Sequence, residues 1–309
     1  MISIGIVSCD EWIGKIKEDL LLQQKLYSMG IVTDIISWED KQADFNKYDC
    51  LILRSAWGYH KKIEDFYKWL NDIEQSGITL LNSPNIIKNN IQKNQQFELL
   101  KKHDIPLIDT VFIKSNELNE SITADISRII ENQFYNLSSF VIKPIISGSG
   151  NNTYILSLNN TFGRPNEIAL CDLQDCFQFM YNTPNNGLMI QPFISGIDSG
   201  ETASIFIDGL NTHNVKRFPN IFHDKRKPEK TTLTTEESNL ANRILSIPDY
   251  QDVFYARVDM VDIKGIPTVM EVELAEPDLM IKAIEDKNEQ DKVVGHFAKK
   301  LVRRMNNGK

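Results

Sequence analysis

Residues 255–274 read YARVDMVDIKGIPTVMEVEL, two runs that alternate polar and apolar residues on either side of Gly265. Such alternation predicts two antiparallel strands joined by a turn, with one polar face and one face on the core. We expect the core face to hold the apolar members of both runs, namely Val258, Met260, Met270, Val272 and Leu274.

The polar face of this hairpin gathers charged residues. With the turn centred on Gly265, Asp259 lies opposite Glu271, and Arg257 lies opposite Glu273. The three carboxylates repel one another, and a divalent cation would remove that repulsion. Oxygen ligands without histidine favour magnesium, so we predict Asp259, Glu271 and Glu273 as ligands of two Mg²⁺ ions, with Mn²⁺ as an alternative.

Two alternatives stand against this metal site. Antiparallel sheets commonly keep one polar, solvated face, in which case the charges need no ligand. The register is also an assumption, because a two-residue turn at Lys264–Gly265 would pair Asp259 with Met270 and move the carboxylates apart.

A lysine followed by a glycine-rich stretch marks a second candidate site. Lys143 ends the apolar run FVIKP, and the next residues, IISGSGNN, include Ser147, Gly148 and Gly150. Backbone N–H groups of such a loop can surround phosphate oxygens, although the same composition is typical of a plain hairpin loop. Lys93, on a helix expected over 90–103, could serve the same phosphates or be an ordinary solvated lysine.

The strand GLMIQPFI at 187–194 is a third candidate. Beyond Gln191 the run meets a proline, so its backbone groups could leave the ladder and bind an adenine edge, with Phe193 or Ile194 covering the ring. An interrupted edge strand is the alternative interpretation. On a later strand, Lys216 and Arg217 could bind a carboxylate or a phosphate, or lie on a solvated edge.

The first 85 residues alternate strands and helices, which predicts a small parallel sheet with helical crossovers. Ligands of such sheets bind beyond the carboxyl ends of the strands. Arg54 follows one strand, and we predict that it grips a substrate carboxylate. Trp57 and Tyr59 could wall that pocket or pack on the following helix.

Composition excludes several classes of protein. The chain has 309 residues and a formal charge of -8, so a general basic field for nucleic acid is absent. Neither an export signal nor ~18 consecutive apolar residues appears, and we expect a cytoplasmic protein without a membrane span. The scattered histidines complete no zinc site, and the four cysteines are expected as reduced thiols: Cys9, Cys50, Cys171 and Cys176.

Taken in order, these motifs resemble the ATP-grasp superfamily over nearly the whole chain. The resemblance implies a mixed α/β and α+β fold, with a Rossmann-like parallel-sheet domain and two α+β subdomains that grip the nucleotide. We expect these parts at 1–85, 86–190 and 191–309.

The same resemblance implies roles for individual residues. Lys93 and Lys143 would bind the ATP phosphates together with the glycine loop, and Glu201 would bind the ribose. Gln191 to Ile194 would form the adenine hinge. Arg257, Lys143 and Arg217 would act in catalysis, and the substrate would meet Arg54, Trp57, Tyr59 and Lys216.

Within the superfamily the chain resembles ligases related to the cyclo-ligase of D-cycloserine biosynthesis. The shared motifs are RSAWGYH at 54–60, Asn82-x-Pro84, QPF at 191–193 and the hairpin motifs. Two positions depart from the subgroup, because Ala56 and Gly58 replace an expected threonine and aspartate. Glu273 stands where most ATP-grasp ligases have asparagine.

The resemblance implies an ATP-dependent ligase that converts a carboxylate to an acylphosphate, which an amine or similar nucleophile then attacks. The expected partners are small carboxylate and amine substrates, and a homodimer is left open. A non-catalytic ATP-binding regulator of the same fold is the alternative. A kinase lacks its His-Arg-Asp loop here, and a dinucleotide enzyme lacks its glycine fingerprint.

Overall fold

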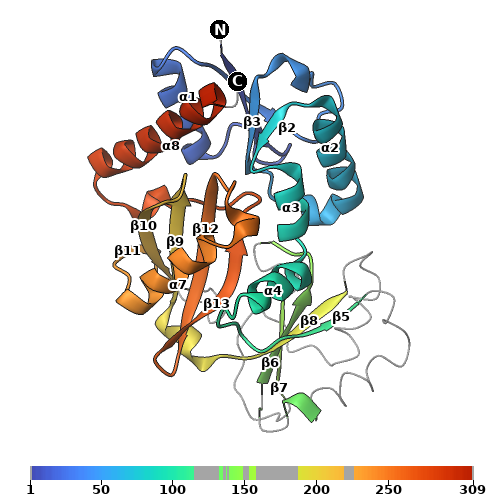
Figure 1. Cartoon of the computed structure of the whole chain (residues 1–309), viewed down its shortest axis with the longest axis vertical. Helices are drawn as coiled ribbons and strands as arrows, with labels where there is room; N and C mark the ends of the chain where they lie inside the picture. The colour runs from blue at the N-terminus through green and yellow to red at the C-terminus, as the bar shows by residue number, and fades with distance from the viewer. Residues whose placement is uncertain are drawn as a thin grey trace.

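The computed structural model describes residues 2–114, 132–134, 137, 139–148, 153–157, 187–218 and 226–307. Three sheets organise these residues (Figure 1). Three residues singled out from the sequence, Gly150, Cys171 and Cys176, lie outside the described residues.

The N-terminal sheet has the order β2-β1-β3-β4, and every pair in it is parallel, as predicted. One face packs on α1 and α8, and the other packs on α2. The elements are β1 (Ser3–Ser8), α1 (Lys17–Ser28), β2 (Val32–Ser37), β3 (Cys50–Ser55), α2 (Ile63–Ser76) and β4 (Thr79–Leu81).

The C-terminal sheet is antiparallel, with the order β11-β10-β9-β12-β13. Asp208 and Gly209 both have positive φ and join β9 to β10 in a two-residue hairpin turn. The strands are β9 (Glu201–Ile207), β10 (Leu210–Arg217), β11 (Glu229–Thr231), β12 (Tyr255–Ile263) and β13 (Ile266–Glu273), with α7 (Thr235–Leu245) behind them.

The last hairpin has both the pairing expected for a turn centred on Gly265 and the two-residue turn considered as the alternative. Its turn has two residues, Lys264 and Gly265, both with positive φ. A bulge then leaves Met270 as an extra residue, so that Met260 lies opposite Val269 while Asp259 still lies opposite Glu271. The bulge therefore restores the pairing that the short turn would have lost. It also corrects the predicted core face, because Val269 is fully buried there and Met270 is only half-buried.

The central sheet has the order β5-β8-β6-β7. Its strands are β5 (Val111–Ile113), β6 (Ser139–Pro144), β7 (Tyr154–Ser157) and β8 (Leu188–Pro192). The division of the chain at 1–85, 86–190 and 191–309 stays a prediction, and β8 crosses its second boundary. The helix expected over 90–103 is present as α4 (Lys93–Lys102), and a further helix, α3 (Pro84–Asn90), precedes it between the N-terminal sheet and the central one.

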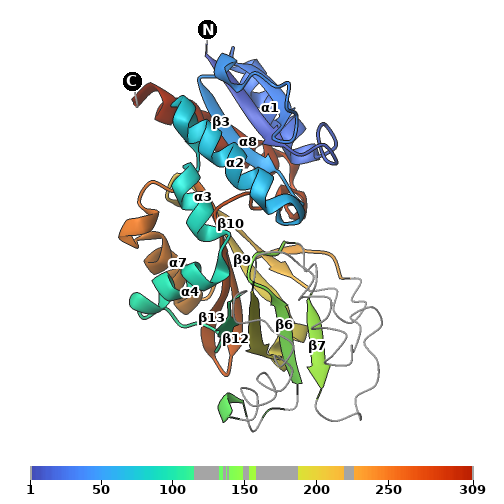
Figure 2. The same cartoon turned by 90° about the vertical axis from the view of Figure 1, so that its right-hand side faces the viewer.

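The last helix, α8 (Lys287–Asn307), packs against both the N-terminal domain and the C-terminal sheet. It lies beside α1 and above the C-terminal sheet (Figures 1 and 2). One hydrophobic core contains residues of β1, α1, β9 and α8 together. None of the helices in the described part of the chain combines the length and apolar character needed to cross a lipid bilayer.

Candidate active site

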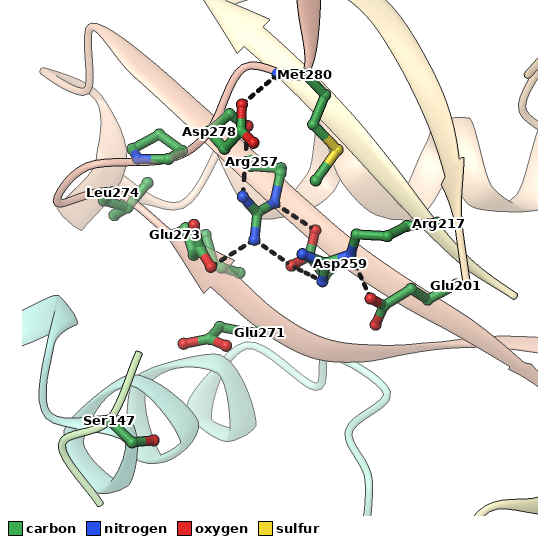
Figure 3. A network of polar contacts seen from close by, with 12 residues as sticks. Ser147, Glu201, Arg217, Arg257, Asp259, Glu271, Glu273, Leu274, Asp278 and Met280 are labelled. Atoms are coloured by element: carbon green, nitrogen blue, oxygen red, sulfur yellow. Dashed lines mark hydrogen bonds and ion pairs between the residues drawn. The ribbon is translucent and has the colours of Figure 1, made fainter. Parts of the chain in front are cut away.

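The polar face of the last hairpin carries a network centred on Arg257 (Figure 3). The Arg257 guanidinium donates to both carboxylate oxygens of Asp259, at 2.8 Å each, and contacts Glu273. All three side chains rise from the same face because they occupy alternate or opposite positions of β12 and β13. The predicted register of this face is confirmed.

A second arginine reaches the same carboxylate from the neighbouring strands. Arg217, at the end of β10, donates to Asp259 Oδ2 at 3.0 Å and forms an ion pair with Glu201 at the start of β9 (Figure 3). Glu201 is buried, and burial raises its pKa although Arg217 partly offsets the shift. Glu201 therefore holds Arg217 beside Asp259 in this structure, and ribose binding by Glu201 stays a prediction.

Lys93 connects the hairpin to the glycine loop. Its ammonium group lies 2.9 Å from Glu271 Oε1 and donates to the Ser147 carbonyl at 2.9 Å. The side chain is only 5% exposed, so it is not the solvated lysine that a helical position commonly gives. These contacts bring together a predicted phosphate lysine, a predicted phosphate loop and a predicted metal ligand.

The two lysines predicted to bind phosphate, Lys93 and Lys143, share one electrostatic environment. Burial lowers the pKa of Lys143, Glu271 opposes that shift, and the charge of Lys93 adds to it. Gly148 lies close to the N-terminal domain, because a Cβ added there would stand 3.5 Å from His60 Nδ1. The start of the glycine loop, at Ser147 and Gly148, thus lies beside Lys93 and close to the N-terminal domain.

The carboxylates of the hairpin differ in how well they are neutralised. Burial would raise the pKa of Asp259 and of Glu271, but arginines and lysines more than offset it, and both pKa values lie below the ordinary range. Burial raises the pKa of Glu273 to about 7, where Arg257 opposes the shift and Glu271 and Asp259 add to it. Negative charge is therefore in excess around Glu273.

Sequence reasoning missed two acidic residues beyond the hairpin. Burial and the charge of Glu273 raise the pKa of Glu276 well above its ordinary value. Glu276 also contributes to the raised pKa of the buried Tyr59 hydroxyl, after burial itself. The backbone carbonyl of Asp278 accepts a hydrogen bond from the Arg257 guanidinium at 3.4 Å. Their signal in the sequence is the run EVELAEPD at 271–278, in which acidic residues continue past the strand.

The donor set of this face suits a divalent cation in its chemistry and in its charge. The hard carboxylate oxygens of Glu271 and Glu273 share a face, and the raised pKa of Glu273 marks a place where added positive charge is favourable. Asp259 has both oxygens bound by arginines. Within the described residues, no three acidic, histidine or cysteine side chains converge closely enough to hold a metal by themselves.

The predicted adenine hinge continues the central sheet further than expected. Gln191 pairs with Val141, and its side chain donates to Thr110 Oγ1 at 2.9 Å. The backbone N–H of Phe193 donates to the Ser139 carbonyl at 2.9 Å, so the ladder extends past Pro192. Ile194 then precedes a short 3₁₀ helix at Ser195–Ser199.

Arg54 lies in the interior rather than at an open strand end. It is 4% exposed, donates to the Pro277 carbonyl at 2.9 Å, and lies 3.5 Å from Glu18 and 3.6 Å from Asp19. The expected cleft mouth is covered by the segment that follows β13. A substrate carboxylate would have to compete with these partners for the guanidinium group.

The other predicted substrate residues are dispersed. Tyr59 is buried and stacks on Phe66 with ring centroids 4.8 Å apart, which agrees with the packing alternative. Trp57 forms an edge contact with Trp12 at 5.7 Å. Lys216 precedes Arg217 on a regular stretch of β10, so the two side chains point to opposite faces of the sheet. The structure therefore does not bring Lys216 together with the hairpin carboxylates.

Two comparisons with known proteins find the same group of relatives. Residues 4–82 match the family model of the D-cycloserine synthetase DcsG N-terminal domain. The cycloserine biosynthesis protein DcsG of Streptomyces lavendulae is 22% identical over 275 residues, which are 84% of this chain and 86% of that protein.

Solved structures show which fold the whole chain has. The crystal structure of D-cycloserine synthetase DcsG matches with a TM-score of 0.79 at 18% identity, covering 98% of this chain and 99% of the other. The ATP-grasp ligase PsnB, in a complex with a variant precursor, Mg and ADP, matches with a TM-score of 0.62 at 13% identity, covering 99% and 98%. The chain has the ATP-grasp fold. D-alanine–D-alanine ligase from Bacillus anthracis matches over all of both chains, with a TM-score of 0.63 at 18% identity.

These matches confirm the predicted resemblance to ATP-grasp ligases and to the D-cycloserine cyclo-ligase group. The structure shows where the two departures within the RSAWGYH motif, Ala56 and Gly58, lie. Ala56 is fully buried, and Gly58 has a φ of +96°, which glycine adopts without strain. The change from aspartate to glycine at position 58 thus removes a side chain where the backbone begins a 3₁₀ helix, Tyr59–Lys62.

Proposed function

We propose that this ATP-grasp protein is an ATP-dependent ligase. It would transfer the γ-phosphoryl group of ATP to a substrate carboxylate and join the resulting acylphosphate to an amine or a related nucleophile. ADP and phosphate leave, and a C–N bond forms. A small, amino-acid-like substrate is the proposed class, in keeping with the resemblance to D-cycloserine synthetase.

One observation carries this proposal. Lys93 contacts Glu271 on the hairpin and the Ser147 carbonyl of the glycine loop at 2.9 Å each. A phosphate-binding lysine, a loop of backbone amides and hard oxygen ligands therefore occupy one place. Transfer of a phosphoryl group depends mainly on positioning and on neutralising charge, which this combination can supply.

The residues of the chain divide this work. Lys93 and Lys143 would neutralise the phosphate oxygens, and Arg257 would stabilise the oxyanion that develops when the nucleophile attacks. Arg217, held by Glu201, would support the same charge from β10. Glu271 and Glu273, with Asp259 in competition with its arginines, would hold Mg²⁺, which when bound supplies further neutralisation of the triphosphate.

The acidic residues provide the first prediction. We expect Asp259→Asn and Glu271→Gln each to abolish ATP-dependent phosphate release and to weaken Mg²⁺-dependent binding of ADP, because each removes a charged oxygen donor from the face. Phosphate release with a panel of amino acids and small dipeptides, and calorimetry with ADP and Mg²⁺, measure the two effects. The exposed substitution Glu98→Gln is the control. Wild-type values in either hairpin variant would refute the assignment.

The same assay separates the ligase from a regulator of the same fold. A ligase releases phosphate only when both a carboxylate and a nucleophile are present. A regulator binds ATP with Mg²⁺ and turns over none of it with any substrate. The complete set of Arg257, Asp259, Glu271 and Glu273 on one face favours the ligase.

A further inference from the structure

Among the described residues no strand lies beside the outer edge of β13, which is the last strand of its sheet. Near Val269 this edge is covered by the chain at Pro106 and Leu107, through a backbone hydrogen bond of 2.9 Å and an isolated bridge. Further along, side-chain amides take the place of a neighbouring strand. This is the stretch of β13 that carries the two glutamates of the active-site face.

Two amides bind this stretch in the manner of a strand. Gln96 Oε1 accepts from the Val272 N–H at 3.0 Å, and Gln96 Nε2 donates to the Val272 carbonyl at 2.7 Å. Asn90 Oδ1 accepts from the Leu274 N–H at 2.9 Å, and Asn90 Nδ2 donates to the Val272 carbonyl at 2.8 Å. We call Asn90 and Gln96 the amide clamp.

The amide clamp is itself fixed. Gln96 is 2% exposed and Asn90 is 8% exposed, and Gln96 Nε2 also lies 3.3 Å from the Asn90 carbonyl. Both amides therefore have partners for their oxygen and for their nitrogen. A buried amide that is satisfied in this way has one orientation and transmits it to the backbone that it binds.

The clamp acts on the residue between two candidate ligands. Val272 separates Glu271 from Glu273, so the position of its peptide groups sets the directions of both carboxylates. The bulge in the ladder with β12 lies just before this stretch, between Val269 and Glu271. The clamp therefore holds the outer edge of β13 where regular pairing with β12 resumes after the bulge.

Side chains of helix α4 contact both the backbone and a side chain of β13. Lys93 and Gln96 are three residues apart and therefore share one face of α4. Lys93 contacts the Glu271 carboxylate while Gln96 binds the adjacent Val272 peptide groups. One helix consequently fixes the distance between a phosphate lysine and the hairpin carboxylates.

We propose that Asn90 and Gln96 are positioning residues that set the affinity of Glu271 and Glu273 for a divalent cation. The inference rests on the proposed function, since it assigns these two glutamates to the cation. Hydrogen-bond partners that orient metal ligands change metal affinity by about 10-fold to 100-fold when they are removed. The clamp differs from ordinary partners of this kind in that it holds the ligands through their backbone.

The test compares two substitutions of one type. Gln96→Met keeps the length of the side chain and removes both hydrogen bonds to Val272. Gln23→Met is the matched control, because Gln23 Nε2 also donates to a backbone carbonyl, that of Thr33 at 2.9 Å, but in the N-terminal domain. Binding of Mn²⁺ in the presence of ADP is followed by electron paramagnetic resonance, and binding of ADP in EDTA is measured separately.

We expect Gln96→Met to weaken Mn²⁺ binding by about 10-fold or more while ADP binding in EDTA changes less than about twofold. Gln23→Met should leave both affinities unchanged even where it lowers the melting temperature. If Gln96→Met does not fold, Asn90→Leu replaces it, because leucine has nearly the shape of asparagine and removes the hydrogen bonds to Val272 and Leu274 without adding a charge. Faster hydrogen exchange at the Val272 amide, whose N–H donates to Gln96, should accompany the loss in the Gln96→Met protein.

The outcomes separate the two proposals. Wild-type Mn²⁺ affinity in all of the clamp variants overturns the positioning role and leaves the ligase proposal in place. Equal losses in Gln23→Met and Gln96→Met also overturn it, since the effect would then follow stability. Absence of Mn²⁺ binding to the wild-type protein with ADP overturns the proposed function and this inference together.

Discussion

Two groups of buried charges in the described part of the chain differ in how they are balanced. On the hairpin face, Arg257 and Arg217 bind Asp259 while Glu273 retains excess negative charge. Near the end of β3, one arginine, Arg54, faces Glu18 and Asp19. A buried charge is costly unless it is paired, so each group ties segments that are distant in sequence to one another.

Glu18 allows a prediction about pH. Burial raises its pKa from 4.5 to about 7, with Asp278 adding to the shift and Arg54 opposing it. In the unfolded chain Glu18 loses its proton near its ordinary pKa, whereas the folded chain keeps the proton until about pH 7. The stability that protonated Glu18 contributes is therefore complete below about pH 4.5 and is lost as the pH rises to about 7. The free energy of unfolding falls by about 3 kcal/mol at most over this range.

We expect Glu18→Gln to lose this dependence, because a glutamine cannot ionise. The free energy of unfolding of the variant, relative to wild type, should therefore rise between pH 5 and pH 8 in urea titrations. The same substitution at the exposed Glu98 provides the control. A difference between Glu18→Gln and wild type that stays constant across this range would contradict the prediction.

At the scale of elements, the last hairpin shows what sequence could and could not predict. Alternation of residue types correctly assigned both strands, their shared polar face and the pairs Asp259–Glu271 and Arg257–Glu273. It could not distinguish a wide turn from a two-residue turn with a bulge, because both give the same pairs near the active site. One predicted core residue was therefore wrong, because Val269 rather than Met270 is buried in the core.

Tertiary contacts explain the remaining differences. Nothing near Arg54 in the sequence shows that Pro277, 223 residues later, will cover it. Gln96 and Asn90 are ordinary polar residues in a polar helical region, and only the unpaired edge of β13 gives them a role. Local patterns therefore predicted elements and their faces, whereas burial of polar groups depended on segments that pack from far along the chain.

The turn of this hairpin provides a prediction at the same scale. Lys264 has a φ of 56° and Gly265 a φ of 85°, the left-handed pair of a type I′ turn. Asparagine before glycine suits this turn better than lysine does, so Lys264→Asn should raise the free energy of unfolding by about 0.5 to 1 kcal/mol. Lys264→Val should lower it, because a β-branched side chain resists positive φ. Equal stability of the two variants in urea titrations would argue against a type I′ turn.

At the scale of the whole molecule, the two terminal regions share one core although they belong to different sheets. Residues of β1 and α1 pack in the same cluster as residues of β9 and α8. Lys25 on α1 and Asp291 on α8 add an ion pair at 2.9 Å across this junction. Because the active-site hairpin lies in the sheet that α8 covers, the N-terminal domain and the hairpin should unfold together.

Phe297 on α8 tests this cooperativity. It is 1% exposed, and its ring lies 5.0 Å from that of Phe254 and 5.6 Å from that of Tyr255. Phe297→Ala should therefore cost about 3 to 5 kcal/mol of unfolding free energy. The loss should appear equally in far-UV circular dichroism and in tryptophan fluorescence, because every tryptophan lies in the first 85 residues: Trp12, Trp38, Trp57 and Trp69.

A matched substitution in the central sheet distinguishes shared from separate unfolding. Phe140 on β6 is fully buried but lies outside the core that α8 completes. Phe140→Ala should lower the midpoint of the unfolding transition measured by circular dichroism. The midpoint measured by tryptophan fluorescence should change much less. If Phe297→Ala left the tryptophan transition at its wild-type midpoint, the N-terminal domain would be stable by itself, and the shared core would not couple it to the hairpin.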